Sequence, residues 1–323
     1  MKRTLGAAAG AALATVLTIS APVALPRGDG AHGAGAAHRR DDPVVAAFSA
    51  TTRSTPWRPA ARIALDFPTY HPQGFALVGD RIFMSTVEII EAPVRYPEPV
   101  DGHDRSPGRG VGHVLVLDRA GHLLRDVVLG EGDAYHPGGI DFDGRSVWVP
   151  VAEYRPDSAA VIYRLDPTTY RVREAFRVRD HVGGVVRDRA TGQVHGVSWG
   201  SRTLYRWTPD GRQLSRRPNE DHLLDYQDCD YAAYRKQICG GVTGLPAPGG
   251  GAYELGGLAL RDLGSGRILH EVPFPVFSSA GHVVTRNPVA LEARDGVLRL
   301  FTAPDDGEEA AGTELLVYET PLT

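Results

Sequence analysis

The sequence has 323 residues and carries 39 acidic against 35 basic side chains, for a formal net charge of −4. The basic residues are spread along the chain and form no stripe of positive charge, so we expect no nucleic-acid partner. After the N-terminal region no apolar run approaches the ~18 residues that a membrane-spanning helix requires, so we expect no membrane association of the mature chain.

The N-terminal region predicts export. Residues 1–3 include two basic side chains, and residues 5–20 form an uncharged apolar run, as in a secretory signal peptide. We assign residues 1–36 to the signal peptide and the start of a linker. Residues 37–56 lack hydrophobic periodicity and are expected to be a disordered linker. Residues 57–323 are expected to form the single domain of a secreted, extracellular monomer.

A short motif recurs along the predicted domain and marks the start of five repeats. The sequence YHPQG at 70–74 recurs as YHPGG at 135–139. Partial copies are HVGG at 181–184, CGGV at 239–242 and NPVA at 287–290. Because motifs that recur along a chain in this way are typical of propellers and solenoids, the repeat indicates the fold class before any local structure is considered.

Each start is followed by the pattern of an antiparallel sheet. Gly-Asp at 79–80 and Asp-Gly at 143–144 and 295–296 separate β-rich runs, as hairpin turns do. Third and fourth strands complete each repeat of about 45–65 residues, which is the length of a four-stranded propeller blade. We therefore predict an all-β fold, a β-propeller with five blades, with six blades as the alternative.

The fifth repeat lacks its outermost strand. Its third strand is expected at 315–318, and too few residues follow for a fourth. A β-rich run at 62–67 precedes the first start in the place of an outermost strand. We predict that this N-terminal strand pairs with the last repeat and closes the ring, which removes the exposed sheet edges.

Two segments interrupt the repeat. Residues 90–112, rich in Pro, Gly and charge, are expected to be a long loop between the second and third strands of the first blade. Residues 214–238 are interpreted as an insertion with a short helix held by a disulfide. Long insertions often serve as lids over binding sites, and a plain surface excursion is the alternative.

Cys229 and Cys239 are the only cysteines. In an exported chain two nearby cysteines most simply form one disulfide bond. A free reactive thiol and a metal site are less favoured alternatives, the latter because no further Cys ligands are present.

The repeated H-P-x-G starts and the turns after the third strands resemble those of the secreted propellers of the lactonase, strictosidine-synthase and quinoprotein-like groups. The whole mature chain is similar to an uncharacterised actinobacterial family of exported proteins. The resemblance implies a propeller with a site at one mouth of the channel. In lactonase-like propellers, acidic and Asn residues hold calcium, whereas here several starts carry His.

Several polar residues occupy matched places in the repeats. The loop that enters an innermost strand and the loop that leaves the second strand lie on the same face of a propeller. Glu88 and Glu153 each follow the histidine of their own repeat by 17 residues, so we expect each carboxylate near that histidine. The candidate ligand-binding residues at this mouth are His71, Glu88, His136, Glu153, His181, Asn287 and Asp305, and the candidate metal ligands are His71, His136, His181 and His282.

Imidazole and carboxylate groups at one mouth permit two kinds of site. A divalent metal such as zinc, iron or copper could bind to the imidazoles, with carboxylates as their hydrogen-bond partners. Alternatively, the same groups could orient a polar substrate, with His and Glu as a general base pair. The structural alternative is that each histidine only bonds to its own blade junction.

Two other motifs carry less weight. The string GVSWG at 196–200 matches that of serine hydrolases, but a β-rich run follows it where that chemistry needs a helix. Asp225, Asp228 and Asp230 lack the Gly and the terminal Glu of an EF-hand loop and are interpreted as a solvated acidic loop.

The leading hypothesis is a secreted propeller that binds a small polar or metal-bearing ligand at the His-lined mouth, with hydrolase or lyase activity left open. The alternative is a non-catalytic extracellular interaction module.

Overall fold

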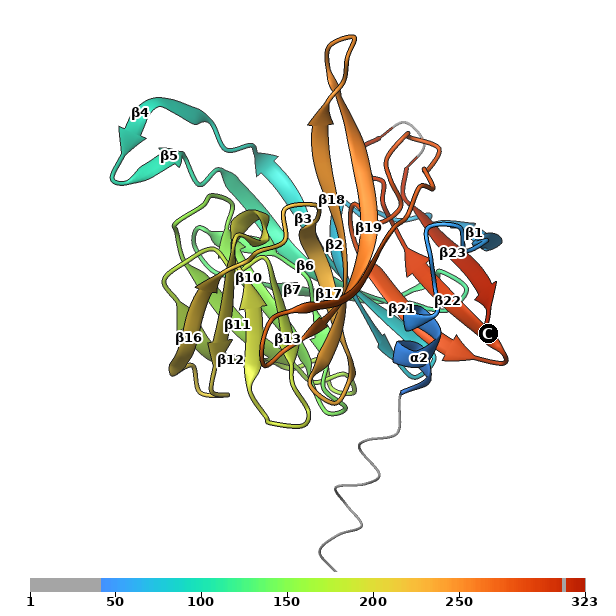
Figure 1. Ribbon diagram of the computed structural model, residues 1–323. Coiled ribbons are helices and arrows are strands. Elements are labelled where there is room, and N and C mark those ends of the chain that lie inside the picture. Colours follow the sequence, from blue (N-terminus) through green and yellow to red (C-terminus); the bar gives the residue numbers. More distant parts are fainter. Residues whose placement is uncertain (1–41, 310–311, 323) are drawn as a thin grey trace, which may run out of the picture. The chain divides into compact units, whose positions relative to one another are not determined.

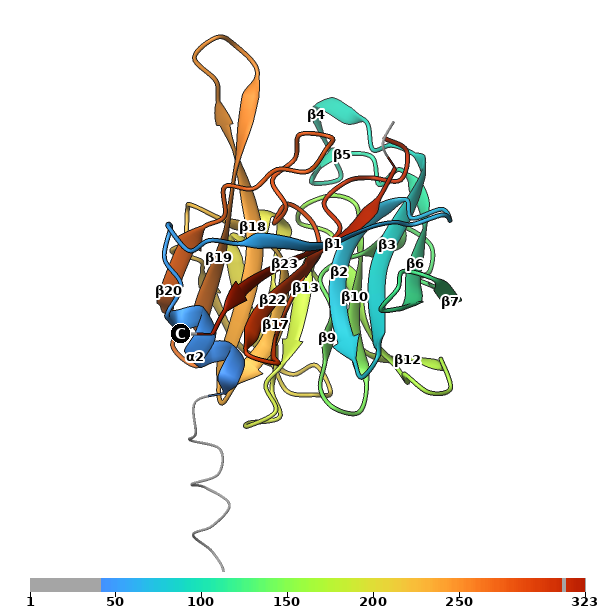
Figure 2. The same ribbon diagram turned by 90° about the vertical axis from the view of Figure 1, so that its right-hand side faces the viewer.

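The computed structural model describes residues 42–309 and 312–322, and the predicted signal peptide lies outside them. The fold is a five-bladed β-propeller, as predicted (Figures 1 and 2). The strands of each blade are given from the innermost outward. Blade one consists of β2 (His71–Val78), β3 (Arg81–Glu91), β6 (Arg109–Asp118) and β7 (Leu123–Leu129). Blade two consists of β8 (Ala134–Pro137) with β9 (Asp141–Phe142), then β10 (Val147–Glu153), β11 (Ala160–Leu165) and β12 (Val172–Val178). Blade three consists of β13 (Gly184–Arg187), β14 (Val194–Val197), β15 (Thr203–Trp207) and β16 (Gln213–Pro218). Blade four consists of β17 (Asp225–Ala233), β18 (Lys236–Pro246), β19 (Ala252–Asp262) and β20 (Ile268–Pro273). Blade five consists of β21 (Val289–Arg294), β22 (Val297–Thr302), β23 (Glu314–Pro321) and β1 (Arg58–Ala64).

The glycines of the repeated motif lie where innermost strands of different blades approach one another near the axis of the propeller. A Cβ atom on Gly74 would lie 2.7 Å from the backbone of Gly139 in the next blade. One on Gly139 would lie 2.7 Å from the carbonyl oxygen of Gln227. Only glycine permits so close an approach of backbones. The motif therefore marks the axial contact between blades, which explains its recurrence.

An aspartate closes the axis of the propeller. On its axial side an innermost strand has no neighbouring strand whose carbonyl groups could accept hydrogen bonds from its backbone N–H groups. Buried N–H groups need such acceptors. Asp228 on β17 supplies one: its Oδ2 accepts the N–H groups of Phe75 (2.7 Å) and Val289 (3.2 Å), and its Oδ1 accepts that of Ile140 (3.2 Å). Asp228 is 1% exposed. Its interpretation as part of a solvated loop was wrong.

The N-terminal strand closes the ring. β1 pairs antiparallel with β23, from Arg58 opposite Glu319 to Ala64 opposite Glu314. The strand lies a few residues before the predicted 62–67, because the chain leaves the sheet after Leu65 donates its N–H to Thr313. Closure through this strand is confirmed.

A short helix precedes the closing strand. α2 (Pro43–Ser49) begins at Asp42, whose carboxylate accepts the N–H of Val44 (2.9 Å). Val45 and Phe48 are buried in an apolar cluster formed with blades four and five. The described part of residues 37–56 is therefore not a disordered linker, because this helix packs its apolar face on the propeller. The sequence pattern is too short to reveal that face.

The prediction for blade four was wrong. Residues 214–238 are not an insertion with a helix, because they form most of β16 and the whole of innermost β17. The start expected at 239–242 lies in β18, the second strand. Cys229 and Cys239 form the predicted disulfide, directly opposite each other on β17 and β18. β17 was missed because its polar side chains are buried through contacts with other blades, which no local pattern shows.

The insertion in blade one is a projecting hairpin. β3 and β6 continue beyond the blade and lead to β4 (Arg95–Val100) and β5 (His103–Arg105), which pair with each other. Figure 1 shows this hairpin and the long β18–β19 hairpin extending at the same end of the propeller. In the described part of the chain, no helix is long and apolar enough to cross a membrane.

Candidate functional site

A cavity of about 260 Å³ opens at the end of the propeller where the repeated motifs begin. Its walls come from the innermost strands and adjoining loops of blades one to four. The lining residues are His71, Gln73, His136, Tyr154, His181, Gly183, Ser198, Trp199, Gly200, Asp225, Tyr226 and Gln227.

The histidines of three successive blades meet in this cavity. The ring centroids of His71 and His136 are 6.2 Å apart, and those of His136 and His181 are 6.1 Å apart. His71 lies opposite Val87 in its blade and His136 lies opposite Ala152, sixteen residues later in both cases. The two positions are therefore equivalent in register, and the repeat brings the side chains to one mouth.

The outer two histidines are oriented through Nδ1. His71 Nδ1 lies 2.6 Å from Oδ1 of Asp306, and His181 Nδ1 lies 2.8 Å from the carbonyl oxygen of Glu153. A carbonyl oxygen only accepts hydrogen bonds, so Nδ1 of His181 carries the proton and its Nε2 is an acceptor. The carboxylate of Asp306 orients His71 in the same way.

The central histidine has no such partner. His136 is 5% exposed, and neither Nδ1 nor Nε2 has a hydrogen-bond partner among the described residues. Its ring stacks on Tyr154 at a centroid distance of 4.1 Å. Burial, together with neighbouring His181 and His71, lowers the pKa of His136 well below its usual value. Burial also lowers the pKa of His181 to about 4. Both rings are neutral at physiological pH.

Two aromatic side chains and an arginine complete the wall. Trp199 meets His181 edge-on at 4.8 Å and lies 5.7 Å from Tyr154. The guanidinium of Arg105, from β5 of the blade-one hairpin, lies 5.1 Å from the centre of the Trp199 ring. The hairpin thus reaches the wall that blades two and three form, as a lid does.

The predicted pairing of each glutamate with its own histidine was wrong. Glu88 comes one residue after Val87, the partner of His71, so it lies on the opposite face of β3. Its carboxylate lies 4.0 Å from Nε2 of His113. The Glu153 carboxylate pairs with Arg155 at 2.6 Å, and only its carbonyl oxygen meets the cavity histidines, through His181.

The blade-five candidates lie beside the cavity, outside its lining. His282 is held between Glu254 and Glu309, at 2.9 Å from each. Asn287 donates to the carbonyl of Pro304 (3.1 Å), and Asp305 accepts from the hydroxyl of Ser278 (2.5 Å). His282 therefore does not join the three cavity histidines.

The described residues hold no three His, Cys, Asp or Glu side chains placed to bind one metal ion together. Two imidazoles on one zinc ion, with Zn–N bonds of ~2 Å in tetrahedral geometry, have ring centres only about 5 Å apart. The histidine rings of the cavity are more than 1 Å further apart than that. As they stand, they form a polar cavity wall.

The sequence analysis missed Tyr154 and Trp199 as site residues. Each follows the histidine of its own repeat by 18 residues, Tyr154 after His136 and Trp199 after His181. A search for aromatic residues at this offset would have found both. Trp199 was considered only as part of the serine-hydrolase string at 196–200, which begins in β14 and ends in a short 3-10 turn.

Solved structures resemble this fold at low sequence identity. A hypothetical protein from Leishmania major has a TM-score of 0.47 and 10% identity, covering 82% of this chain and 91% of its own. A luciferin-regenerating enzyme has a TM-score of 0.41 and 12% identity, covering 82% and 96%. The WD40 domain of Neurospora crassa Pan2 has a TM-score of 0.41 and 10% identity, covering 84% and 98%. Scores this low say nothing about function.

No curated protein matches the sequence. A protein-family model, described as a family of unknown function (DUF6454), matches residues 41–323. The matched residues include all five blades, the closing strand and the cavity lined by His71, His136 and His181, which we call the histidine cavity. The chain therefore belongs to the DUF6454 family.

Proposed function

We propose that this protein binds a small, uncharged, hydroxyl-bearing molecule in the histidine cavity. The observation that carries the proposal is His136, a buried imidazole with two unpartnered nitrogens that lies between the imidazoles of His71 and His181. Leaving a buried polar group without a partner costs about 1–3 kcal/mol. A ligand that supplies the missing hydrogen bonds would recover this energy on binding.

The composition of the wall supports this class of ligand. His136 and His181 are neutral, and His181 presents an acceptor nitrogen, which suits hydroxyl donors. Gln73, Gln227 and Ser198 add groups that both donate and accept, and Tyr154 and Trp199 add flat apolar surface. A volume of about 260 Å³ suits a molecule smaller than typical drug-sized ligands.

The setting we propose is extracellular. The signal-peptide pattern at residues 1–36 supports export, and the Cys229–Cys239 disulfide is typical of proteins in oxidising compartments. The resemblance of the sequence to secreted propellers with a ligand site at one channel mouth supports the same location for the site.

A second candidate is a metal-bearing ligand. Nδ1 of His71 and of His181 is held by a carboxylate and a carbonyl, which is how metal-binding imidazoles are oriented in proteins. An ion would have to draw the rings together from their present spacing. Metal analysis of the purified protein decides: a stoichiometric ion that is lost in His71→Ala and His181→Ala would support this candidate over the first.

The variant His136→Phe is expected to lose ligand binding and to be more stable than the wild type. Phenylalanine keeps the stacking on Tyr154 and removes both unpartnered nitrogens, so the free energy of unfolding should rise by about 1–3 kcal/mol. Denaturant unfolding measures stability, and saturation-transfer NMR against a library of neutral polyols and sugars measures binding.

The matched control is His122→Phe, because His122 is an exposed turn residue whose ring pairs with Asp118. This control should bind like the wild type. If His136→Phe still binds the compounds that the wild type binds, the proposed site is wrong.

The stabilities of the wild type and of His136→Phe should also respond differently to pH. His136 has a folded-state pKa well below the value of about 6.5 in the unfolded chain, so below that pH the unfolded state binds a proton that the folded state does not. Wild-type stability therefore falls as pH drops through 6.5, by up to ~1.4 kcal/mol per unit from this residue. His136→Phe lacks the effect, so its stability advantage over the wild type should grow as pH falls from 7 to 5, as measured by urea unfolding.

A further inference from the structure

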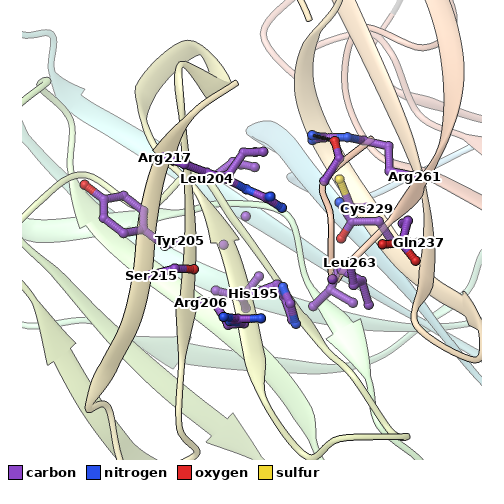
Figure 3. Close-up of a pocket in the computed structure, with 18 residues that line it drawn as sticks. His195, Leu204, Tyr205, Arg206, Ser215, Arg217, Cys229, Gln237, Arg261 and Leu263 are labelled. Atoms are coloured by element: carbon purple, nitrogen blue, oxygen red, sulfur yellow. Dashed lines mark hydrogen bonds between the residues drawn. The ribbon is translucent and has the colours of Figure 1, made fainter. Parts of the chain in front are cut away.

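A second cavity, of about 30 Å³, lies between blades three and four and is rich in cationic side chains; we call it the arginine cavity. Arg206 and Arg217 enter it from β15 and β16, and Arg261 enters it from β19. Figure 3 shows Arg217 and Arg261 reaching toward the gap from opposite sides, with His195 from β14 below them. The volume is enough for two or three waters or one small ion.

Arg261 is the most deeply buried of these cations. It is 2% exposed, and its Nη2 donates to the carbonyl of Gly266 (2.7 Å) while its guanidinium lies 4.8 Å from the centre of the Tyr226 ring. Its Nε and Nη1 have no partner among the described residues. Burial lowers the pKa of Arg261 by disfavouring its charged form, while Tyr226 and Asp221 act in the opposite sense. A buried guanidinium with unused donors points to a missing acceptor.

The neighbouring cationic side chains are only partly satisfied, since Nη1 of Arg217 donates to the carbonyl of Ser265. Nε of Arg206 and Nε2 of His195 are also buried without a partner in the described parts of the chain. None of Arg206, Arg217 and Arg261 has a described carboxylate within 4.0 Å. Burial, with added repulsion from Arg206 and Arg217, lowers the pKa of His195 to about 4.

The nearby carboxylates form no ion pair with these arginines in the described part of the chain. Asp262 lines the cavity, but its Oδ1 accepts the backbone N–H (2.6 Å) and the hydroxyl (2.7 Å) of Ser265 in its own turn. Asp221 accepts the hydroxyl of Tyr226. Glu271 lies beside Asp221, outside the cavity lining and beyond ion-pair distance of Arg261, and its Oε1 has no partner among the described residues. Three guanidinium groups therefore face the cavity with one carboxylate that already has partners.

We propose that this cavity binds a small inorganic anion, which accepts hydrogen bonds from Arg261 and Arg217 and joins blade three to blade four. The site is separate from the histidine cavity and independent of its ligand. The backbone of β17 divides the two, because Tyr226 and Gln227 line the first cavity and Cys229 lines the second.

Thermal unfolding with added anions tests the proposal. The full mature protein is dialysed free of small anions, and sodium chloride, sulfate or phosphate is added at constant ionic strength set with gluconate. An anion that binds only the folded state stabilises it by RT ln(1 + c/Kd) at free anion concentration c, so the rise of Tm with anion concentration yields a Kd. We expect such a rise with at least one of the three anions. Its absence with all three would overturn the proposal.

Two variants locate the effect. Arg217→Gln and Arg261→Met should each weaken the apparent Kd by about tenfold or more, since each removes a charge-assisted hydrogen bond. Arg216→Gln makes the same charge change one residue away, on the other face of β16, and should leave Kd unchanged. If Arg261→Met does not fold, the Kd of Arg217→Gln tests the site, because Arg217 is only half-buried. An unchanged Kd in Arg217→Gln would also refute the site.

Discussion

A chain that begins at Tyr70 is expected to be insoluble or unfolded, whereas a chain that begins at Asp42 folds. Without β1, β23 becomes an exposed edge of blade five and the ring has no closing strand. Ile63 and Leu65 also leave the apolar cluster that they form with blades one and five. Soluble yield, size-exclusion chromatography and thermal unfolding by circular dichroism measure the effect.

A chain that begins at Trp57 separates the strand from the helix. It keeps β1 and the contact of Trp57 with Phe274 (5.1 Å) but lacks α2. Loss of fully buried Phe48 alone should cost about 3–5 kcal/mol, so this chain should fold with reduced stability. Equal stability of the chains that begin at Asp42 and Tyr70 would show that closure through β1 is dispensable.

Replacement of the axial carboxylate should have a comparable effect. Asp228→Ala leaves the backbone N–H groups of Phe75, Ile140 and Val289 without an acceptor. At about 1–3 kcal/mol for each unsatisfied group, the loss is about 3–9 kcal/mol, which approaches the whole stability of a typical domain. Urea unfolding measures the decrease in the free energy of unfolding if the variant folds. Failure to obtain soluble protein would correspond to the upper end of this range.

Two variants on β17 make this test specific. Asp228→Asn keeps one acceptor oxygen and should fall between the wild type and Asp228→Ala. Asp225→Ala lies on the same strand, but its side chain is 42% exposed and pairs only with Arg202, so its cost should stay below about 1 kcal/mol. Equal losses in Asp225→Ala and Asp228→Ala would contradict the axial role of Asp228.

β17 links the functional and structural features of the molecule. Tyr226 and Gln227 line the histidine cavity, Asp228 accepts the axial N–H groups, and Cys229 joins β17 to β18 while it lines the arginine cavity. One strand thus holds the inner wall of both proposed sites. The disulfide and the axial hydrogen bonds keep that wall rigid, which lowers the cost of ordering it when a ligand binds.

Features that repeat along the chain could be predicted from the sequence. The motifs at 70–74 and 135–139 recur because blades one and two need glycine at their axial contacts, and the equal place of the histidine in both motifs carries His71 and His136 to the same mouth. The missing strand of the last repeat likewise predicted the closure by β1. These features depend on local backbone geometry, which is the same in every blade.

Other features depend on contacts between blades, and only the tertiary structure decided them. Asp228 looks like a solvated acid in the sequence, and it is buried because N–H groups from three other blades bond to it. Within blade one, the register of β2 with β3 was also needed: it places His71 opposite Val87, so strand alternation turns Glu88 to the opposite face. The arginine cavity brings residues of two blades together, and its unpaired charges become visible only once both blades are in place. A repeat determines what each blade shares, whereas burial and pairing between blades depend on side chains that differ from one blade to the next.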